Sequence, residues 1–384
     1  MMRSKQKAVL VLGMHRSGTS ALTRVLNLLG LDLPQGLMPA QLENRHGFWE
    51  SVELQDLHDQ ALASCNSWWG DWTCVPRQWF DSNECRKFSD QLVGILRRDF
   101  SDSAMFVIKD PRICRLAPLW LHTLAQIDIE PLVVMPVRHP AEVSASLAIW
   151  SGFDPLISNL LWLRHVFDGE RYTRGIPRSF VTFDELMSNW QSTVRKIGED
   201  LQIEWPIVPA SASAVIEAFL SPGDRHHSVQ SERALPVWVA TTYQGLLSEV
   251  EQGAKRWSAQ DWDRLYGKFD QVATSLGNIT LHTERQKKTE KLKVAEITAG
   301  REAEALKTAN VALRRDIECL KADVGREIET LKAANDTAGR EIEALNADRE
   351  QLSKEVLTLL NSTSWRITAP LRVIISLLKK STFR

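Results

Sequence analysis

An apolar strand that leads through a short loop bounded by glycines into a helix constrains this chain more than any other feature. The predicted strand is Ala8–Leu12, the loop runs from Gly13 to Gly18, and helical spacing follows over Ala21–Leu29. Backbone N–H groups at the start of such a helix point into the loop, and the helix macrodipole adds positive potential there. The segment therefore predicts an oxyanion site at the carboxyl end of a buried strand.

The loop comes close to a Walker A motif but lacks its decisive residue. Both glycines have the required spacing, yet Thr19 occupies the position of the Walker lysine, and Ser20 follows it as a second hydroxyl donor. The cation instead lies inside the loop, where Arg16 precedes Ser17. These residues favour phosphate-type binding without the usual lysine of a nucleoside triphosphatase.

Three further apolar runs predict strands, at Met105–Ile108, Pro131–Val137 and Phe180–Phe183. Stretches with helical spacing lie between the strands, for example Ala141–Trp150. Strands that alternate with helices indicate an α/β domain with a P-loop-like, mostly parallel sheet and flanking helices.

A second anion-binding pattern follows the third predicted strand. The strand ends at Arg138, Pro140 breaks it, and a helix begins. Ser146 comes eight residues after Arg138, two turns into that helix, so its hydroxyl can face back toward the strand end. The guanidinium fork matches phosphate oxygens, and the pattern predicts a second phosphate contact.

Together, and in this order, the two motifs resemble the donor site of bacterial glycan-type sulfotransferases that use 3′-phosphoadenosine-5′-phosphosulfate (PAPS). In that family a Lys or Arg precedes S-G-T-[ST] in the 5′-phosphosulfate loop, and a strand–Arg–x–Pro–x₅–Ser element binds the 3′-phosphate. The resemblance covers roughly residues 5–230 and implies PAPS as co-substrate, without a metal. It assigns donor binding to Arg16, Ser17, Gly18, Thr19, Ser20, Arg138 and Ser146, and an Arg-His segment adds Arg225.

The same resemblance assigns the catalytic groups. Lys109 ends the second predicted strand, as does the family lysine that approaches the sulfuryl group, and with Arg16 it neutralises the leaving phosphate. Pro111 stands where many small-molecule sulfotransferases carry a catalytic His, which excludes that mechanism. Glu50, after G-F-W, matches the base of glycan-type and tyrosyl-type members, and the neighbouring aromatics should raise its pKa. His46 is the reserve candidate for the base.

Aromatic residues crowd the segment that follows the predicted base. Indole rings stack on the apolar faces of sugars and offer an N–H group to a polar rim. This density favours a carbohydrate acceptor, although core packing explains such residues equally well. The residues are Trp68, Trp69, Trp72, Trp79 and Phe80.

The composition changes beyond about Glu284, where aromatics vanish until Trp365 and Glu, Lys, Arg, Ala and Leu dominate. Apolar positions there repeat at steps of three and four residues, which predicts a coiled coil over residues 284–360 with one stutter. Asn310 and Asn335 fall at a-type positions and favour a parallel homodimer. A solvated single helix or a disordered segment is the alternative.

Residues 361–384 form a predicted basic amphipathic tail. Its S-W-R-I-T-A-P-L-R string resembles tails of bacterial surface-polysaccharide glycosyltransferases. Apolar residues share one helix face and basic residues flank it, which suits an anionic membrane surface or a polysaccharide-assembly enzyme. The apolar residues are Leu371, Ile374, Ile375 and Leu378, and the basic ones are Arg372, Lys379 and Lys380.

Composition restricts the remaining possibilities. A net charge of −1 argues against nucleic acid as a partner, and five cysteines at irregular spacing indicate a reducing compartment. No run approaches 18 apolar residues and no secretory signal is visible, so we expect a cytoplasmic protein, peripheral at the inner membrane face.

The sequence thus predicts a sulfotransferase domain over residues 1–280 that modifies a surface polysaccharide or glycolipid. An NTP-dependent kinase with the same loop is one alternative. An inactive domain that serves as a scaffold or chain-length ruler is another.

Overall fold

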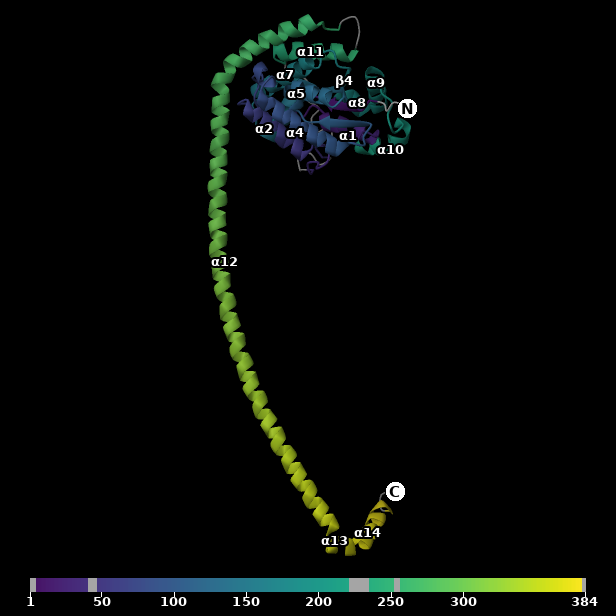
Figure 1. Ribbon diagram of the computed structural model, residues 1–384, viewed down its shortest axis with the longest axis vertical. Coiled ribbons are helices and arrows are strands. Elements are labelled where there is room, and N and C mark those ends of the chain that lie inside the picture. Colours follow the sequence, from purple (N-terminus) through teal and green to yellow (C-terminus); the bar gives the residue numbers. More distant parts are fainter. Residues whose placement is uncertain (1–4, 41–46, 221–234, 252–255, 382–384) are drawn as a thin grey trace. The chain divides into compact units, whose positions relative to one another are not determined.

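The computed structural model describes residues 5–40, 47–220, 235–251 and 256–381, and for residues 278–296 and 377–381 it describes the backbone alone. The chain divides into two compact units, Met1–Gln286 and Lys287–Arg384. In Figure 1 the first unit is coloured from purple to green and the second from green to yellow.

A four-stranded parallel sheet forms the centre of the first unit. Its strands are β1 (Lys7–Val11), β2 (Met105–Lys109), β3 (Glu130–Val137) and β4 (Arg178–Thr182). Their order is β2-β1-β3-β4, and every neighbouring pair is parallel. Each predicted strand is present, with its start and end shifted by two residues at most. The predicted α/β class is confirmed.

Helices cover both faces of this sheet because its strands are apolar on both sides. Ala8 and Leu10 of β1 belong to one core cluster, whereas Val9 and Val11 belong to the other, as the two-residue period of a strand requires. The first cluster packs against α4 (Asn83–Phe100), α5 (Ile113–Gln126) and α7 (Pro155–Tyr172). The second packs against α1 (Thr19–Leu28), α9 (Trp190–Leu201) and α10 (Pro209–Phe219).

The strand order places a topological switch point beside β1. The chain leaves β1 for β2 on one side and then returns to β3 on the other side. In such sheets ligands bind outside the carboxyl ends of the strands at the switch point. Here those ends lead into α1, α5 and α6 (Pro140–Ser151), and β4 leads into α8 (Phe183–Ser188). Among the described residues before 259, this unit also contains α2 (Val52–Ser64), α3 (Arg77–Phe80) and α11 (Val237–Glu251).

The long helix α12 (Ala259–Asn361) begins 25 residues before the expected start of the coiled coil at 284 (284 − 259). Its first turns belong to the core of the first unit. The ring of Phe167 in α7 lies 6.3 Å from Trp262 and 5.3 Å from Phe269, centroid to centroid. Arg164 of α7 forms a 2.5 Å ion pair with Asp270. These contacts make residues 259–273 part of the α/β domain.

The second unit contains the rest of α12 with α13 (Thr363–Ile367) and α14 (Ala369–Ser381). The apolar residues that the sequence assigns to a coiled-coil seam are exposed here; Leu306, Leu320 and Leu345 are 67%, 63% and 67% accessible. The helix is therefore present, and its pairing remains a prediction. Within the described residues, no helix combines the length and apolar character needed to cross a bilayer.

Candidate active site

The loop after β1 is a tight turn that only glycine can complete. Gly18 caps α1 with φ 87°, and Arg16 also has a positive φ of 70°. A Cβ atom built on Gly18 would lie 2.3 Å from the ring of Phe183, at the start of α8. A side chain at position 18 would thus meet both backbone strain and a steric clash.

The two phosphate-type motifs meet at this loop. Arg16 Nε donates to Ser146 Oγ over 2.7 Å, and Arg138 Nη1 donates to the Arg16 carbonyl over 3.1 Å. Glu142 accepts from Arg138 Nε over 2.8 Å, and the guanidinium lies 4.5 Å above the Phe183 ring. Residues 122–130 positions apart in the sequence therefore converge where β1 and β3 end.

The loop from Gly13 to Gly18 has a hydrogen-bonding group available for an anion. Ser17 is buried, and its Oγ has no hydrogen-bond partner within the described residues. Buried hydroxyl groups in native proteins are normally hydrogen-bonded, so this atom suits a ligand oxygen. Thr19, also predicted, is buried at the first position of α1. The residues present fit a 5′-phosphosulfate group on the geometry of this loop.

A buried ion pair joins two of the predicted catalytic residues, Glu50 and Lys109. Lys109 Nζ contacts the Glu50 carboxylate and donates to Ser20 Oγ over 3.1 Å. Ser20 in turn donates to the Phe48 carbonyl over 3.2 Å, which ties the segment before Glu50 to the first turn of α1. Burial raises the pKa of Glu50, and the opposing attraction of Lys109 does not cancel this effect. The carboxylate and ammonium groups thus lie together beside the phosphate loop.

A second buried network holds the turn after Lys109. Trp120 Nε1 donates to His58 Nε2 over 2.9 Å, so His58 carries its proton on Nδ1 and donates it to Asp110, also over 2.9 Å. Arg112 Nε donates to Asp59 over 2.7 Å, and its Nη1 contacts Asp110 over 3.1 Å. Burial opposes the charge on Asp110, but Arg112 and His58 hold its pKa well below the usual range. This network fixes the backbone that presents Lys109, and sequence reasoning did not find it.

The predicted aromatic group divides into two parts. Trp72 and Trp79 are core residues, which donate their Nε1–H groups to the Ala273 carbonyl (3.3 Å) and to Ser64 Oγ (2.9 Å). Phe80 packs against Trp79 with ring centroids 5.3 Å apart. These three residues therefore stabilise the domain and do not form the site.

Trp68 and Trp69, the other two, are half-buried beside the phosphate loop. Trp69 lies 5.1 Å from the ring of His15 in that loop, 5.5 Å from Trp150 and 5.3 Å from Phe153, measured between centroids. Sequence reasoning missed Trp150 and Phe153 because they come from the end of α6 and the residues after it. We call Trp68, Trp69, Trp150 and Phe153 the aromatic cluster.

Two buried arginines hold the segment that carries these indoles. Arg115 of α5 donates to the carbonyls of Trp68 and Thr73 over 2.9 and 2.7 Å. Arg164 of α7 donates to the Trp72 carbonyl over 2.7 Å while it pairs with Asp270 of α12. Because both arginines are fully buried, their hydrogen bonds define the conformation of residues 68–73.

Two predicted site residues, His46 and Arg225, lie in segments 41–46 and 221–234, outside the described residues. The described part of the chain contains no group of three or more His, Cys, Asp or Glu side chains arranged to hold a metal ion.

The solved structures that are similar to this chain include three sulfotransferases. The sulfotransferase domain from the Synechococcus PCC 7002 olefin synthase has 16% sequence identity and a TM-score of 0.40, covering 64% of this chain and 96% of that chain. The sulfotransferase domain from the curacin biosynthetic pathway has 14% identity and a TM-score of 0.35, covering 64% and 98%. Sulfotransferase STF1 from Mycobacterium tuberculosis H37Rv has 14% identity and a TM-score of 0.34, covering 63% and 78%. No protein-family model and no curated protein matches the sequence.

Proposed function

We propose that the first unit transfers a sulfuryl group from PAPS to a hydroxyl of a carbohydrate acceptor in surface polysaccharide or glycolipid assembly. The observation that carries this proposal is the convergence of Arg16, Arg138 and Ser146 on one phosphate-type loop. Two separate phosphate contacts suit a nucleotide with a 5′ and a 3′ anion. ATP lacks the 3′-phosphate, and Thr19 replaces the lysine that ATP-binding loops use.

The buried ion pair supplies the chemistry in this proposal. The acceptor oxygen bonds to sulfur, the bond from sulfur to the 5′-phosphate oxygen breaks, and the acceptor proton passes to Glu50. Lys109 and Arg16 stabilise the negative charge that develops on the departing phosphate. A general base contributes typically about 10²–10⁴-fold to rate, and the raised pKa of Glu50 suits that role.

The aromatic cluster supports a carbohydrate acceptor. Its half-buried rings lie next to His15 of the donor loop, where an acceptor must approach the sulfuryl group. Indole faces pack on the apolar faces of sugars. We place the acceptor against Trp69 and Trp150, with the attacking hydroxyl directed toward Glu50.

The second unit supplies location in this proposal. A parallel coiled-coil homodimer over residues 284–360 would carry two tails to the same end. Each tail would then bind an anionic membrane surface or a polysaccharide-assembly enzyme.

Calorimetry on the full chain tests the donor assignment. We expect tight binding of adenosine 3′,5′-bisphosphate and weak binding of ATP, with or without Mg²⁺. Arg138→Ala should cost about 1.5–3 kcal/mol of bisphosphate binding, as for a charged hydrogen bond. Arg195→Ala is the matched control, because Arg195 is exposed on α9 and contacts Ser192. Equal affinity for the two nucleotides would reject PAPS and favour the kinase alternative.

A further inference from the structure

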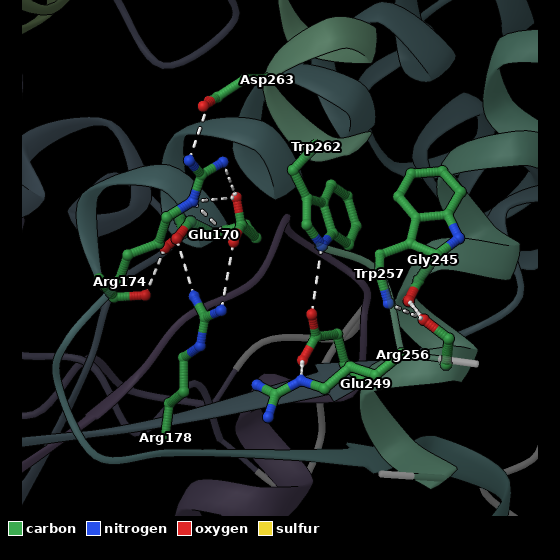
Figure 2. A network of polar contacts seen from close by, with 12 residues as sticks. Glu170, Arg174, Arg178, Gly245, Glu249, Arg256, Trp257, Trp262 and Asp263 are labelled. Carbon is green, nitrogen blue, oxygen red and sulfur yellow. Dashed lines mark hydrogen bonds and ion pairs between the residues drawn. The ribbon is translucent and has the colours of Figure 1, made fainter. Parts of the chain in front are cut away.

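A cavity lies at the opposite end of β4 from the phosphate loop. Its volume is about 390 Å³, and Arg174, Arg178 and Arg256 line it together with Glu170, Glu249 and Trp257. Figure 2 shows these side chains and the hydrogen bonds and ion pairs among them. Arg178 is the first residue of β4, whereas Phe183 follows the last. A five-residue strand spans roughly 15 Å, so the cavity is separate from the site described above.

Both carboxylate oxygens of Glu170 accept hydrogen bonds from two of the three arginines, Arg174 and Arg178. It is buried, accepts from Arg174 Nε and Nη2 over 3.0 and 2.7 Å, and accepts from Arg178 Nη2 over 3.2 Å. Arg174 Nη1 donates to Asp263 over 2.9 Å. Two guanidinium groups thus compensate the buried Glu170 carboxylate on this wall of the cavity.

On the other wall, the carboxylate of Glu249 is also hydrogen-bonded within the protein. It is buried and accepts from Arg256 Nε over 2.6 Å and from Trp262 Nε1 over 3.2 Å. The lining residues therefore hold three cations against two anions, a balance of +1. Asp263 lies outside the lining, and its ion pair with Arg174 offsets the charge of that arginine and not the charge of Arg256.

Only the Nε–H group of Arg256 donates to a described residue. Its Nε is held by the buried Glu249, and the structure records no contact to its Nη1 or Nη2 from the described residues. The side chain is 49% exposed, so a ligand can reach this fork. Ala259, the first residue of α12, also lines the cavity, which puts the positive end of the helix macrodipole at its wall.

We infer that this cavity binds a tetrahedral oxyanion, phosphate or sulfate, with the Arg256 fork as its main donor. Guanidinium forks match such oxyanions in a bidentate geometry, and the charge of the guanidinium group favours anions over neutral ligands. The half-buried Trp257 ring forms part of the wall, and the volume leaves room for an organic group beyond the oxyanion. The ligand is therefore either the free ion or an ester that carries it. This inference does not depend on the reaction proposed above.

Calorimetric titration of the full chain tests the inference. Sodium phosphate, sodium sulfate and glucose 6-sulfate are the probes, and Arg138→Ala is the background because it weakens anion binding at the phosphate loop. Adding Arg256→Gln should reduce affinity for the oxyanion at least about tenfold, since a charged hydrogen bond is lost. Arg256→Lys keeps the charge without the fork and should show an intermediate loss. Arg195→Gln on α9 is the surface control and should bind as the background does.

Binding of all three probes at background strength by Arg256→Gln would overturn the inference. So would the absence of any binding in the Arg138→Ala background. Tighter binding of glucose 6-sulfate than of free sulfate would identify an ester as the ligand, and equal or weaker binding would identify the free ion. Circular dichroism confirms that each variant is folded, as we expect for a half-exposed arginine.

Discussion

The two ends of α12 carry similar apolar side chains in opposite environments. Trp262, Phe269 and Ala273 are 1%, 0% and 0% exposed, because α7 and the segment around Trp72 cover them. Further along the same helix, Leu306 and Leu345 are both 67% exposed. Burial of a leucine side chain contributes about 1.5–3 kcal/mol, so the chain alone forgoes this stabilisation in its second unit. The comparison shows that the first unit buries these apolar side chains within the chain, whereas the second leaves its own exposed.

The ion pairs of the two units differ in the same way. Arg164 pairs with Asp168 at 3.2 Å, and both side chains are almost fully buried. In the second unit, pairs such as Lys321 with Glu318 are about 70% exposed and contribute roughly 0–1 kcal/mol each. The first unit is therefore stabilised by buried contacts within the chain, and we propose that the second gains its stability from a partner helix.

Removing the start of α12 is the most direct test of this difference between the two units. A chain that ends at residue 258 loses Trp262 and Phe269 from the core and leaves Arg164 without Asp270. Each loss costs about 3–5 kcal/mol, and three of them together are comparable to the 5–15 kcal/mol that stabilises a typical domain. We expect no cooperative thermal transition in circular dichroism, whereas a chain ending at Gln286 should melt as the full-length protein does. Equal melting of both truncations would show that the boundary lies earlier.

The chemistry should reside in the first unit alone. Glu50→Gln should reduce transfer about 10²–10⁴-fold, in the full chain and in the chain ending at Gln286, because the acceptor proton loses its base. Binding of adenosine 3′,5′-bisphosphate should not change. Because burial raises the pKa of Glu50, the rate should fall as pH decreases through a value above the usual glutamate range, and the variant should lack this limb. Near wild-type turnover would move the base elsewhere, with His46 next to test.

Location should depend on the second unit alone. A chain that ends at Leu360 should retain transfer to a free acceptor but no longer sediment with anionic vesicles, because it lacks the basic apolar tail. Each basic residue near an anionic surface contributes about 1 kcal/mol, and two tails on a dimer bind more tightly than one. If the vesicles do not bind the intact chain but a partner enzyme does, the tail is a protein-docking element. Unchanged localisation after truncation would exclude the tail as the tether.

The smallest expected effect is on the number of helices that associate in the predicted coiled coil. Replacing Asn310 and Asn335 with Ile should raise the thermal midpoint of a 284–361 segment by a few degrees and shift dimers toward trimers, because buried Asn selects two strands at a cost in stability. Light scattering measures the oligomer. A monomeric wild-type segment at micromolar concentration would refute the predicted seam.

Local patterns predicted the elements well, because apolar runs and glycine positions act over a few residues. The four strands and the loop with Arg16 are of this kind. Contacts between distant segments were harder to anticipate. Glu50 and Lys109 were each expected at the site, but their ion pair depends on how the segment before Glu50 crosses α1, through the bond from Ser20 to the Phe48 carbonyl.

Residue type alone also cannot separate core from site. Trp72 and Trp79 looked like Trp68 and Trp69 in the sequence, and only packing assigns the first two to the core. The histidine of the Asp110 network, His58, lies in the middle of a helix without a recognisable motif. Arg174 and Arg178 lie four residues apart, but Arg256 comes from a distant segment of the chain, so no spacing connects it to the other two arginines of the cavity.

The contact between Gly18 and Phe183 restricts how such sequences can diverge. The ring occupies the volume into which any larger residue at position 18 would grow, so that position stays closed while the ring is present. A smaller residue at 183 would open the space, but it would remove the surface on which Arg138 rests. A substitution at position 18 alone would clash with the Phe183 ring, and one at position 183 alone would remove the contact with Arg138. The two positions must therefore change together or remain as they are.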